Sequence, residues 1–169
     1  YANAQTYWEQ AMATWQIAND DEKNADFLFK QGRVLLLQKK NKKALDALTE
    51  AKLLMEASDR YVNGDWYWYI GQANEQLGKD EEAIASYQLA IERAPTENSQ
   101  GITVRGLYGL GQISEKQQAY EQALAYYEEG YKITQGFPLK ENEMDLANGL
   151  YRINKRKGNH QSALEYLEI

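Results

Sequence analysis

Side chains with which enzymes usually do chemistry are scarce in this sequence. It holds one histidine, His160, and no cysteine, so it offers neither a thiolate nucleophile nor the usual histidine and cysteine ligands of zinc. The adjacent acidic pairs Glu81 with Glu82 and Glu128 with Glu129 fall in helical patterns, where neighbouring side chains diverge by about 100°. We interpret them as solvated surface. No glycine-rich phosphate loop is present. The sequence therefore predicts a protein that is not an enzyme and has no metal site and no cofactor.

Two clusters of basic residues suggest a different chemistry, the binding of anions. One runs from Lys39 to Lys43 in an expected turn, with no aromatic residues interleaved for stacking on bases. The net charge of −6, with both signs interspersed, also gives no general attraction to nucleic acid, so no nucleic-acid partner is predicted. The second cluster lies on one helical stretch and can receive an acidic partner segment if it faces a groove. It consists of Arg152, Lys155, Arg156 and Lys157.

The composition indicates that helices position these residues. Two prolines, 43% apolar residues and an abundance of Ala, Leu, Glu, Gln and Lys favour an all-α chain. No apolar run approaches the roughly 20 residues of a membrane span, so direct membrane insertion is not expected. The absence of cysteine leaves both cytoplasm and periplasm open as compartments.

One pattern of small and large residues recurs along the whole chain. A small residue is followed four positions later by a large one, and three positions after that by another small one. The starts of the five instances are separated by 40, 39, 40 and 40 positions. The instances are Ala4, Trp8, Ala11; Ala44, Leu48, Ala51; Ala83, Tyr87, Ala90; Ala123, Tyr127, Gly130; and Ala163, Leu167 at the end of the chain.

A glycine recurs twelve positions before three of these alanines, inside a helical pattern. These glycines are Gly32, Gly71 and Gly111, and the fourth copy has Tyr151 at the same position. A glycine within a helix costs about 0.5–1 kcal/mol relative to alanine. Its recurrence in register predicts that two helix backbones approach each other closely there.

The second copy resembles the signature of the tetratricopeptide repeat. The residues that carry this resemblance are Tyr67, Ile70, Gly71, Ala83, Tyr87, Ala90 and Pro95, with Gly78 in the turn between the two helices. The third copy departs from the signature at Gly130 and Gln135, the first has polar Gln31, and the fourth retains Leu150, Gly158 and Ala163. The period is longer than the usual 34 residues. Arrays with such long periods resemble those of bacterial signalling proteins and of some eukaryotic scaffold proteins.

The resemblance implies one domain over residues 1–169, a right-handed α-solenoid of stacked antiparallel helix pairs. We expect a lone helix at 3–18 and repeats at about 21–57, 61–93, 99–134 and 140–169, with breaks at Gly64, at 94–101 and at 136–138. The lone helix has the pattern of a second helix, and the last repeat stops within its second helix. We therefore expect a fragment of a longer protein.

The resemblance also implies where a ligand binds, because the first helix of each pair lines the concave surface of such arrays. Three positions before the recurring glycine, whose place Tyr151 takes in the fourth copy, lie Phe29, Trp68, Tyr108 and Asn148. One position after it lie Arg33, Gln72, Gln112 and Arg152. Flat rings beside amide and guanidinium donors suit a groove that holds a peptide. The alternative is that some of these rings pack between repeats, since the four aromatics at 66–69 occupy every side of one helix.

The family's clamp for a terminal carboxylate, built from lysines and asparagines, is not found. The matching positions hold Phe29, Arg33, Tyr69 and Arg105, of which only Arg105 is expected to contribute to binding. A chaperone adaptor is therefore not the favoured interpretation, and Arg105 joins the predicted groove residues.

Three functional hypotheses remain open. The first is a non-catalytic module that binds a protein or peptide segment, as the sensor or interaction part of a larger bacterial regulatory or signalling protein. The second is a passive assembly scaffold or self-association domain, a homo-oligomer joined through terminal helices that expose Trp8 and Trp15. The third is the sensing of a small molecule in the groove. The sequence does not identify the ligand.

Overall fold

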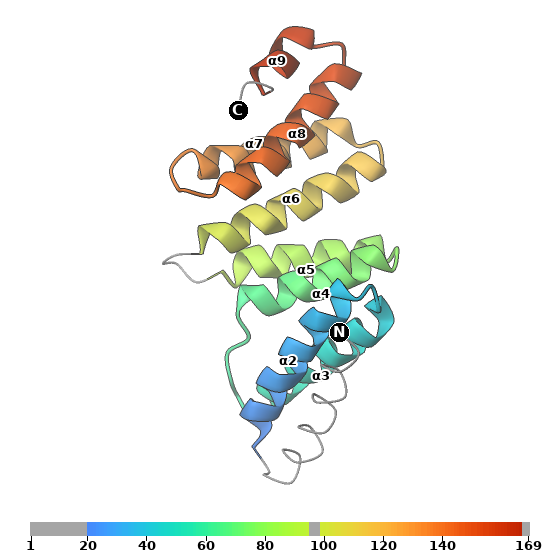
Figure 1. The fold of residues 1–169 in the computed structure, drawn as a ribbon, viewed down its shortest axis with the longest axis vertical. Helices are drawn as coiled ribbons and strands as arrows, with labels where there is room; N and C mark the ends of the chain where they lie inside the picture. Colours follow the sequence, from blue (N-terminus) through green and yellow to red (C-terminus); the bar gives the residue numbers. More distant parts are fainter. Residues whose placement is uncertain (1–19, 95–98, 167–169) are drawn as a thin grey trace.

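The computed structural model describes residues 20–94 and 99–166, and the only regular secondary structure in those residues is α-helix (Figure 1). The predicted lone helix at 3–18, and Pro95 of the repeat signature, lie outside the described residues. None of the helices described is long and apolar enough to cross a membrane. The helices are α2 (Asp21–Leu37), α3 (Asn41–Ala57), α4 (Gly64–Gln76), α5 (Asp80–Glu92), α6 (Gln100–Lys116), α7 (Tyr120–Thr134), α8 (Lys140–Arg156) and α9 (His160–Glu165).

These helices form antiparallel pairs that stack into an elongated array, from α2 and α3 at one end to α8 and α9 at the other (Figure 1). The pairs are α2 with α3, α4 with α5, α6 with α7 and α8 with α9. The expectation of an all-α solenoid of stacked helix pairs is confirmed. The repeats expected at about 21–57 and 99–134 correspond to helix pairs at 21–57 and 100–134, whereas α4 begins at Gly64 where the sequence suggested 61. The predicted end of the last repeat, at 169, lies outside the described residues.

Gly64 is the first residue of α4 rather than part of a loose connection. A Cβ atom there would lie 2.3 Å from the carbonyl oxygen of Ala90, on α5. The Gly64 amide also donates a hydrogen bond to the carbonyl oxygen of Arg93, at 3.1 Å. The start of α4 is therefore packed tightly against the end of α5.

Each first helix of a pair ends in the same tight turn. The residues that follow these helices have positive φ at repeat-equivalent positions: Lys39 at 58°, Gly78 at 74°, Gln118 at 61° and Gly158 at 78°. Around each of them, two backbone hydrogen bonds of the Schellman type close the helix end, such as Lys79 N to Asn74 O at 2.9 Å. The four turns thus share one geometry, although only two of them use glycine.

The recurring glycine of the first helix faces the large residue of its own repeat. A Cβ at Gly71 would lie 2.7 Å from the Tyr87 ring, and a Cβ at Gly111 would lie 2.3 Å from the Tyr127 ring. At Gly32 the corresponding atom is Cγ of Leu48, at 2.5 Å. The expectation of a close backbone-to-backbone approach is therefore corrected: the glycine mainly makes room for a large side chain that crosses between the paired helices.

A second glycine, from the next repeat, covers the other side of each tyrosine ring. A Cβ at Gly109 would lie 2.5 Å from the Tyr87 ring, and one at Gly149 would lie 2.7 Å from the Tyr127 ring. Both rings are almost completely buried. Each tyrosine therefore packs between two first helices and joins neighbouring repeats.

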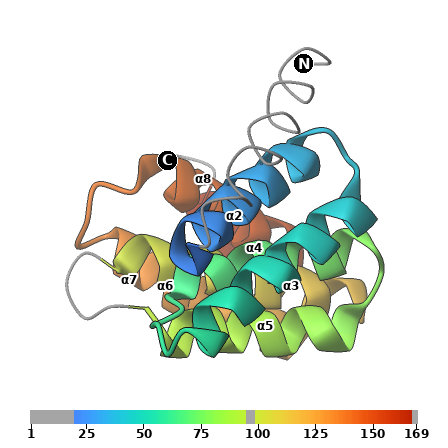
Figure 2. The same cartoon turned by 90° about the horizontal axis from the view of Figure 1, so that it is seen from below.

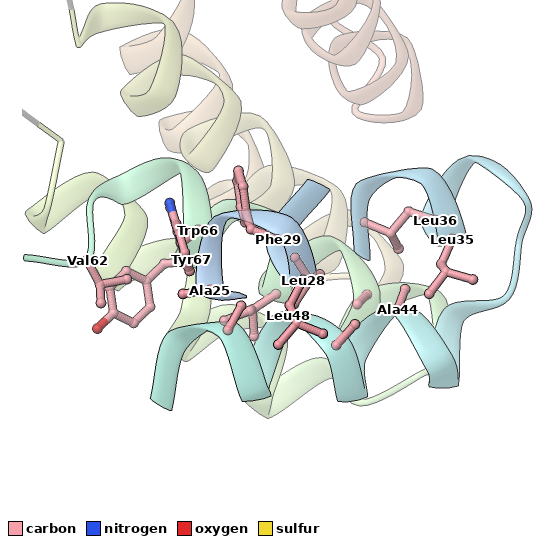
Figure 3. Packing of buried hydrophobic residues seen from close by; sticks show 14 of the residues in the cluster. Ala25, Leu28, Phe29, Leu35, Leu36, Ala44, Leu48, Val62, Trp66 and Tyr67 are labelled. Carbon is pink, nitrogen blue, oxygen red and sulfur yellow. The ribbon is translucent and has the colours of Figure 1, made fainter. Parts of the chain in front are cut away.

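The core is distributed along the array in overlapping clusters, as expected for a solenoid. In the first cluster, Leu28 of α2 lies against α3, where Leu48 is fully buried, and Phe29 lies beside Trp66 of α4 (Figure 3). The Phe29 and Trp66 rings are stacked, with centroids 4.4 Å apart and planes 9° apart. This stack joins the first described repeat to the second.

The stack is curved, with the first helices on the inner side. Successive first helices α2, α4, α6 and α8 touch one another, whereas no comparable contact joins α3, α5 and α7 in the described residues. Viewed along the stack, α3 and α5 lie together on one side of it (Figure 2). Side chains of the first helices therefore line the concave surface, as the resemblance implied.

Candidate functional site

The nine predicted groove residues all lie on first helices, but they differ in how accessible they are. Arg33, Asn148 and Arg152 are exposed, and five others are partly buried. Phe29 is only 8% exposed, because its ring is stacked on Trp66 beneath the surface. Phe29 therefore supports the groove from below. The five partly buried residues are Trp68, Gln72, Arg105, Tyr108 and Gln112.

These five residues come together around one cavity of about 300 Å³ between α4, α6 and the beginning of α8. The cavity lies on the concave side, and Tyr87 and Gly109 contribute to its lining between the helices. Two carboxylates of α8, Glu141 and Asp145, the amide of Asn142 between them, and Glu75 of α4 complete its polar lining. We call this space the central cavity. Phe29, Arg33, Asn148 and Arg152 do not line it.

Arg105 is held in place on one wall of the central cavity. Its Nη2 donates to Asp65 Oδ1 at 2.9 Å, and its Nε donates to the carbonyl oxygen of Gly101 at 3.1 Å. The guanidinium lies over the Trp68 ring, 4.6 Å from the centroid, in a cation–π arrangement. Arg105 and Trp68 thus form a rigid unit that bridges α4 and α6, with one face of the indole covered.

Glu75 and Tyr87 form the polar floor of the central cavity. The Tyr87 hydroxyl donates to Glu75 Oε2 at 2.5 Å. Burial raises the pKa of the Glu75 carboxyl above its ordinary value, although the hydrogen bond from Tyr87 opposes this change. Burial, together with the nearby Glu75, also raises the pKa of Tyr87. The floor is therefore a desolvated carboxylate next to a tyrosine that stays protonated.

The same arrangement recurs one repeat later, with a different electrostatic outcome. The Tyr127 hydroxyl donates to Glu115 Oε2 at 3.1 Å, and Arg152 of α8 binds both oxygens of Glu115, at 2.8 and 3.2 Å. The hydrogen bonds and charge of Arg152 hold the pKa of Glu115 below its ordinary value. Arg152, Arg156 and Lys116 line an adjoining cavity of about 410 Å³. We call this space the basic cavity.

A third cavity, of about 460 Å³, lies nearer the N-terminal end, between α2 and α4. Arg33 lies over the rings of Phe29 and Tyr69, 5.8 and 4.9 Å from their centroids. Gln72 lines both this cavity and the central one. The three cavities therefore follow one another along the inner faces of the first helices, and together they form the candidate groove.

Sequence reasoning missed several residues of this groove. Glu75 and Glu115 stand 40 positions apart, and Asp65 and Asp145 stand 40 positions before and after the predicted Arg105, so the repeat period itself carried a signal for both sets. What the period did not show is that Tyr87 and Tyr127 reach from the core to these carboxylates. Within the described residues, no group of histidine, cysteine or carboxylate side chains has the arrangement of a metal site.

The curved array with a lined inner groove defines a helical-repeat protein of the solenoid class. A tetratricopeptide repeat model matches residues 1–59 and 53–98, and a second tetratricopeptide repeat model matches residues 104–136. The chain belongs to the tetratricopeptide repeat family. No curated protein sequence matches it.

Solved structures share this fold at low sequence identity. Aspartyl phosphate phosphatase F from Bacillus subtilis superposes with a TM-score of 0.87 at 19% identity, over 98% of this chain and 44% of that one. A Rap protein complexed with competence and sporulation factor gives 0.80 at 17% identity, over 96% of this chain and 46% of that one. YrrB, described as a tetratricopeptide protein with an unusual peptide-binding site, gives 0.66 at 20% identity, over 98% and 77%. The chain spans less than half the length of the first two.

Proposed function

We propose that this protein is a non-catalytic module that binds an extended peptide or protein segment in the groove of its first helices. The observation that carries the proposal is the central cavity, where Trp68, Gln72, Arg105, Tyr108 and Gln112 converge. Partly exposed rings supply rigid apolar contact area, and amide groups supply hydrogen bonds to a peptide backbone. The naming of YrrB for a peptide-binding site supports the same use of the fold.

We further propose that the module belongs to a larger regulatory protein. Two structural neighbours, an aspartyl phosphate phosphatase and a Rap protein complexed with competence and sporulation factor, are each more than twice as long as the part that this chain spans. A solenoid contacts only its nearest neighbours, so ligand contacts that bridge two first helices change the curvature of the whole array. Curvature is then the signal passed to the rest of the protein.

Selection from random heptapeptides displayed on phage tests the binding function. Alanine replacement of Trp68 or of Tyr108 should weaken the binding of selected peptides by about tenfold or more, because buried aromatic anchors contribute most of the energy of such interfaces. Phe137→Ala, which removes an exposed ring between α7 and α8, serves as the matched control and should leave affinity unchanged. Unchanged affinity in both folded groove variants would contradict the proposal.

A further inference from the structure

Glu75 and Glu115 occupy equivalent positions in successive repeats. They are 40 residues apart, lie on α4 and α6, and each accepts a hydrogen bond from the tyrosine of its own repeat. Both carboxylates are therefore held in the groove by the same kind of hydrogen bond from a tyrosine. If only one of them also pairs with a cation, the cause is the residues of the next repeat and not the position of the carboxylate in the fold.

Glu115 shows which partner this position accepts. The guanidinium of Arg152 arrives from the first helix of the next repeat and binds it with two hydrogen bonds. Forty positions before Arg152 stands Gln112, the residue that would serve Glu75 in the same way. Its Nε2 instead donates to the Tyr108 hydroxyl, at 3.2 Å. No basic residue in the described part of the chain forms an ion pair with Glu75.

Two cations close to this part of the groove are already engaged elsewhere. Lys116, whose charge acts on Glu75, pairs with Asp80 at 2.7 Å, and Arg105, which lines the central cavity, pairs with Asp65 at 2.9 Å. The opposite wall of the central cavity adds two carboxylates, Glu141 and Asp145, both from α8. The central cavity thus carries an excess of negative charge around a carboxylate that burial has desolvated.

We propose that the central cavity is a subsite for a positively charged side chain of the bound peptide, an arginine or a lysine, which pairs with Glu75. The guanidinium or ammonium group occupies the place that Arg152 fills in the next repeat. The basic cavity beside it, around Arg156, then favours a negative group one step further along the peptide. This inference rests on the proposed function, because it assigns a side chain to a peptide in the same groove.

The experiment compares peptides selected from the phage library on the wild-type chain and on three variants. A selected peptide is synthesised twice, once with arginine at its recurrent basic position and once with citrulline, which has nearly the same shape but no charge. The variant Glu75→Gln removes the proposed partner, and Gln112→Arg supplies a cation from within the chain, by analogy with Arg152. The control is Glu129→Gln, which removes an exposed charge of α7 outside the groove.

We expect wild-type selections to converge on one basic position, and citrulline to weaken binding by about tenfold or more. Both Glu75→Gln and Gln112→Arg should abolish the difference in affinity between the arginine peptide and the citrulline peptide, whereas Glu129→Gln should retain this difference. Gln112→Arg keeps Glu75, so it tests the proposal even where Glu75→Gln does not fold.

Two results would overturn the inference while leaving the groove function intact. One is the selection of peptides that depend on Trp68 and Tyr108 but carry no recurrent basic residue. The other is an arginine preference that persists in both Glu75→Gln and Gln112→Arg. If no selected peptide depends on Trp68 or Tyr108, the groove function itself is contradicted, and this inference with it.

Discussion

At the scale of single residues, Tyr87 and Tyr127 connect the interior of the array with its groove. Each ring is buried between glycines of two successive first helices, and each hydroxyl ends on a carboxylate at the groove surface. Glycine is required on both sides, because a Cβ atom would enter the space of the ring. The position of each groove carboxylate therefore depends on how closely the repeats pack.

Replacing Gly109 by alanine tests this packing. The new Cβ would lie 2.5 Å from a Tyr87 ring that Gly71 already confines on its other side, so the helices must separate. We expect a loss of about 1–3 kcal/mol in unfolding free energy, partly offset by the better helix propensity of alanine. The control is Gly101→Ala on the same helix, where the Cβ would meet only Leu139, at 3.9 Å, and where stability should stay equal or rise. Urea denaturation measures both, and equal effects would contradict the packing account.

The two groove carboxylates predict opposite pH dependences of stability. The pKa of Glu75 in the folded protein is raised above its ordinary value of 4.5. The contribution of Glu75 to stability is therefore present below pH 4.5 and is lost as the pH rises through the pKa of the folded state. The pKa of Glu115 is lowered from the same value, so its contribution is present above 4.5 and is lost as the pH falls through the folded pKa.

Unfolding free energies measured between about pH 3 and about pH 8 separate the two groups. Relative to the wild type, Glu75→Gln should gain stability as the pH rises, and Glu115→Gln should lose stability as the pH rises. The difference arises because Arg152 pairs only with Glu115. If the unfolding free energies of both variants, relative to the wild type, changed in the same direction with pH, the assignment of Glu75 as a carboxylate without a cationic partner would be wrong.

At the scale of elements, the helices were predictable because the apolar period and the turn residues agree. The third repeat, predicted at about 99–134, is observed as α6, which spans Gln100–Lys116, and α7, which spans Tyr120–Thr134. The beginning of α4 differs because Gly64 is needed for a close contact with α5 rather than for a turn. A sequence pattern shows that glycine is present, but only packing shows which neighbour requires it.

In the turns after the first helices, the residue with positive φ is glycine in some repeats and another residue type in others, so each type can be tested in the place of the other. Gly78 has φ of 74° with no atom near a Cβ built there, so Gly78→Ala should cost about 1 kcal/mol through backbone strain alone. Gln118 holds the equivalent position at 61°, so Gln118→Gly should be neutral or stabilising by up to about 1 kcal/mol. Thermal melting of the two single variants checks this. A destabilised Gln118→Gly would show that the Gln118 side chain has a role of its own.

At the scale of the whole molecule, the sequence predicted which helices line the groove but not which of the groove side chains are free of other contacts. The resemblance placed the site on the first helices, and five of the nine predicted residues surround the central cavity. It did not reveal that Phe29 is buried under Arg33, or that Arg105 is held by Asp65. These outcomes depend on side chains from neighbouring repeats, which no pattern within one repeat describes.

A peptide bound on the inner surface of the array covers first helices rather than second helices. Hydrogen–deuterium exchange, measured with and without a peptide selected on the wild-type chain, distinguishes the two surfaces because the two kinds of helix give separate signals. We predict that the peptide slows exchange in α4, α6 and α8, which supply most of the lining of the central cavity, and leaves α3 and α7, which supply none of it, unchanged. Protection confined to α3 and α7 would show that the peptide binds elsewhere.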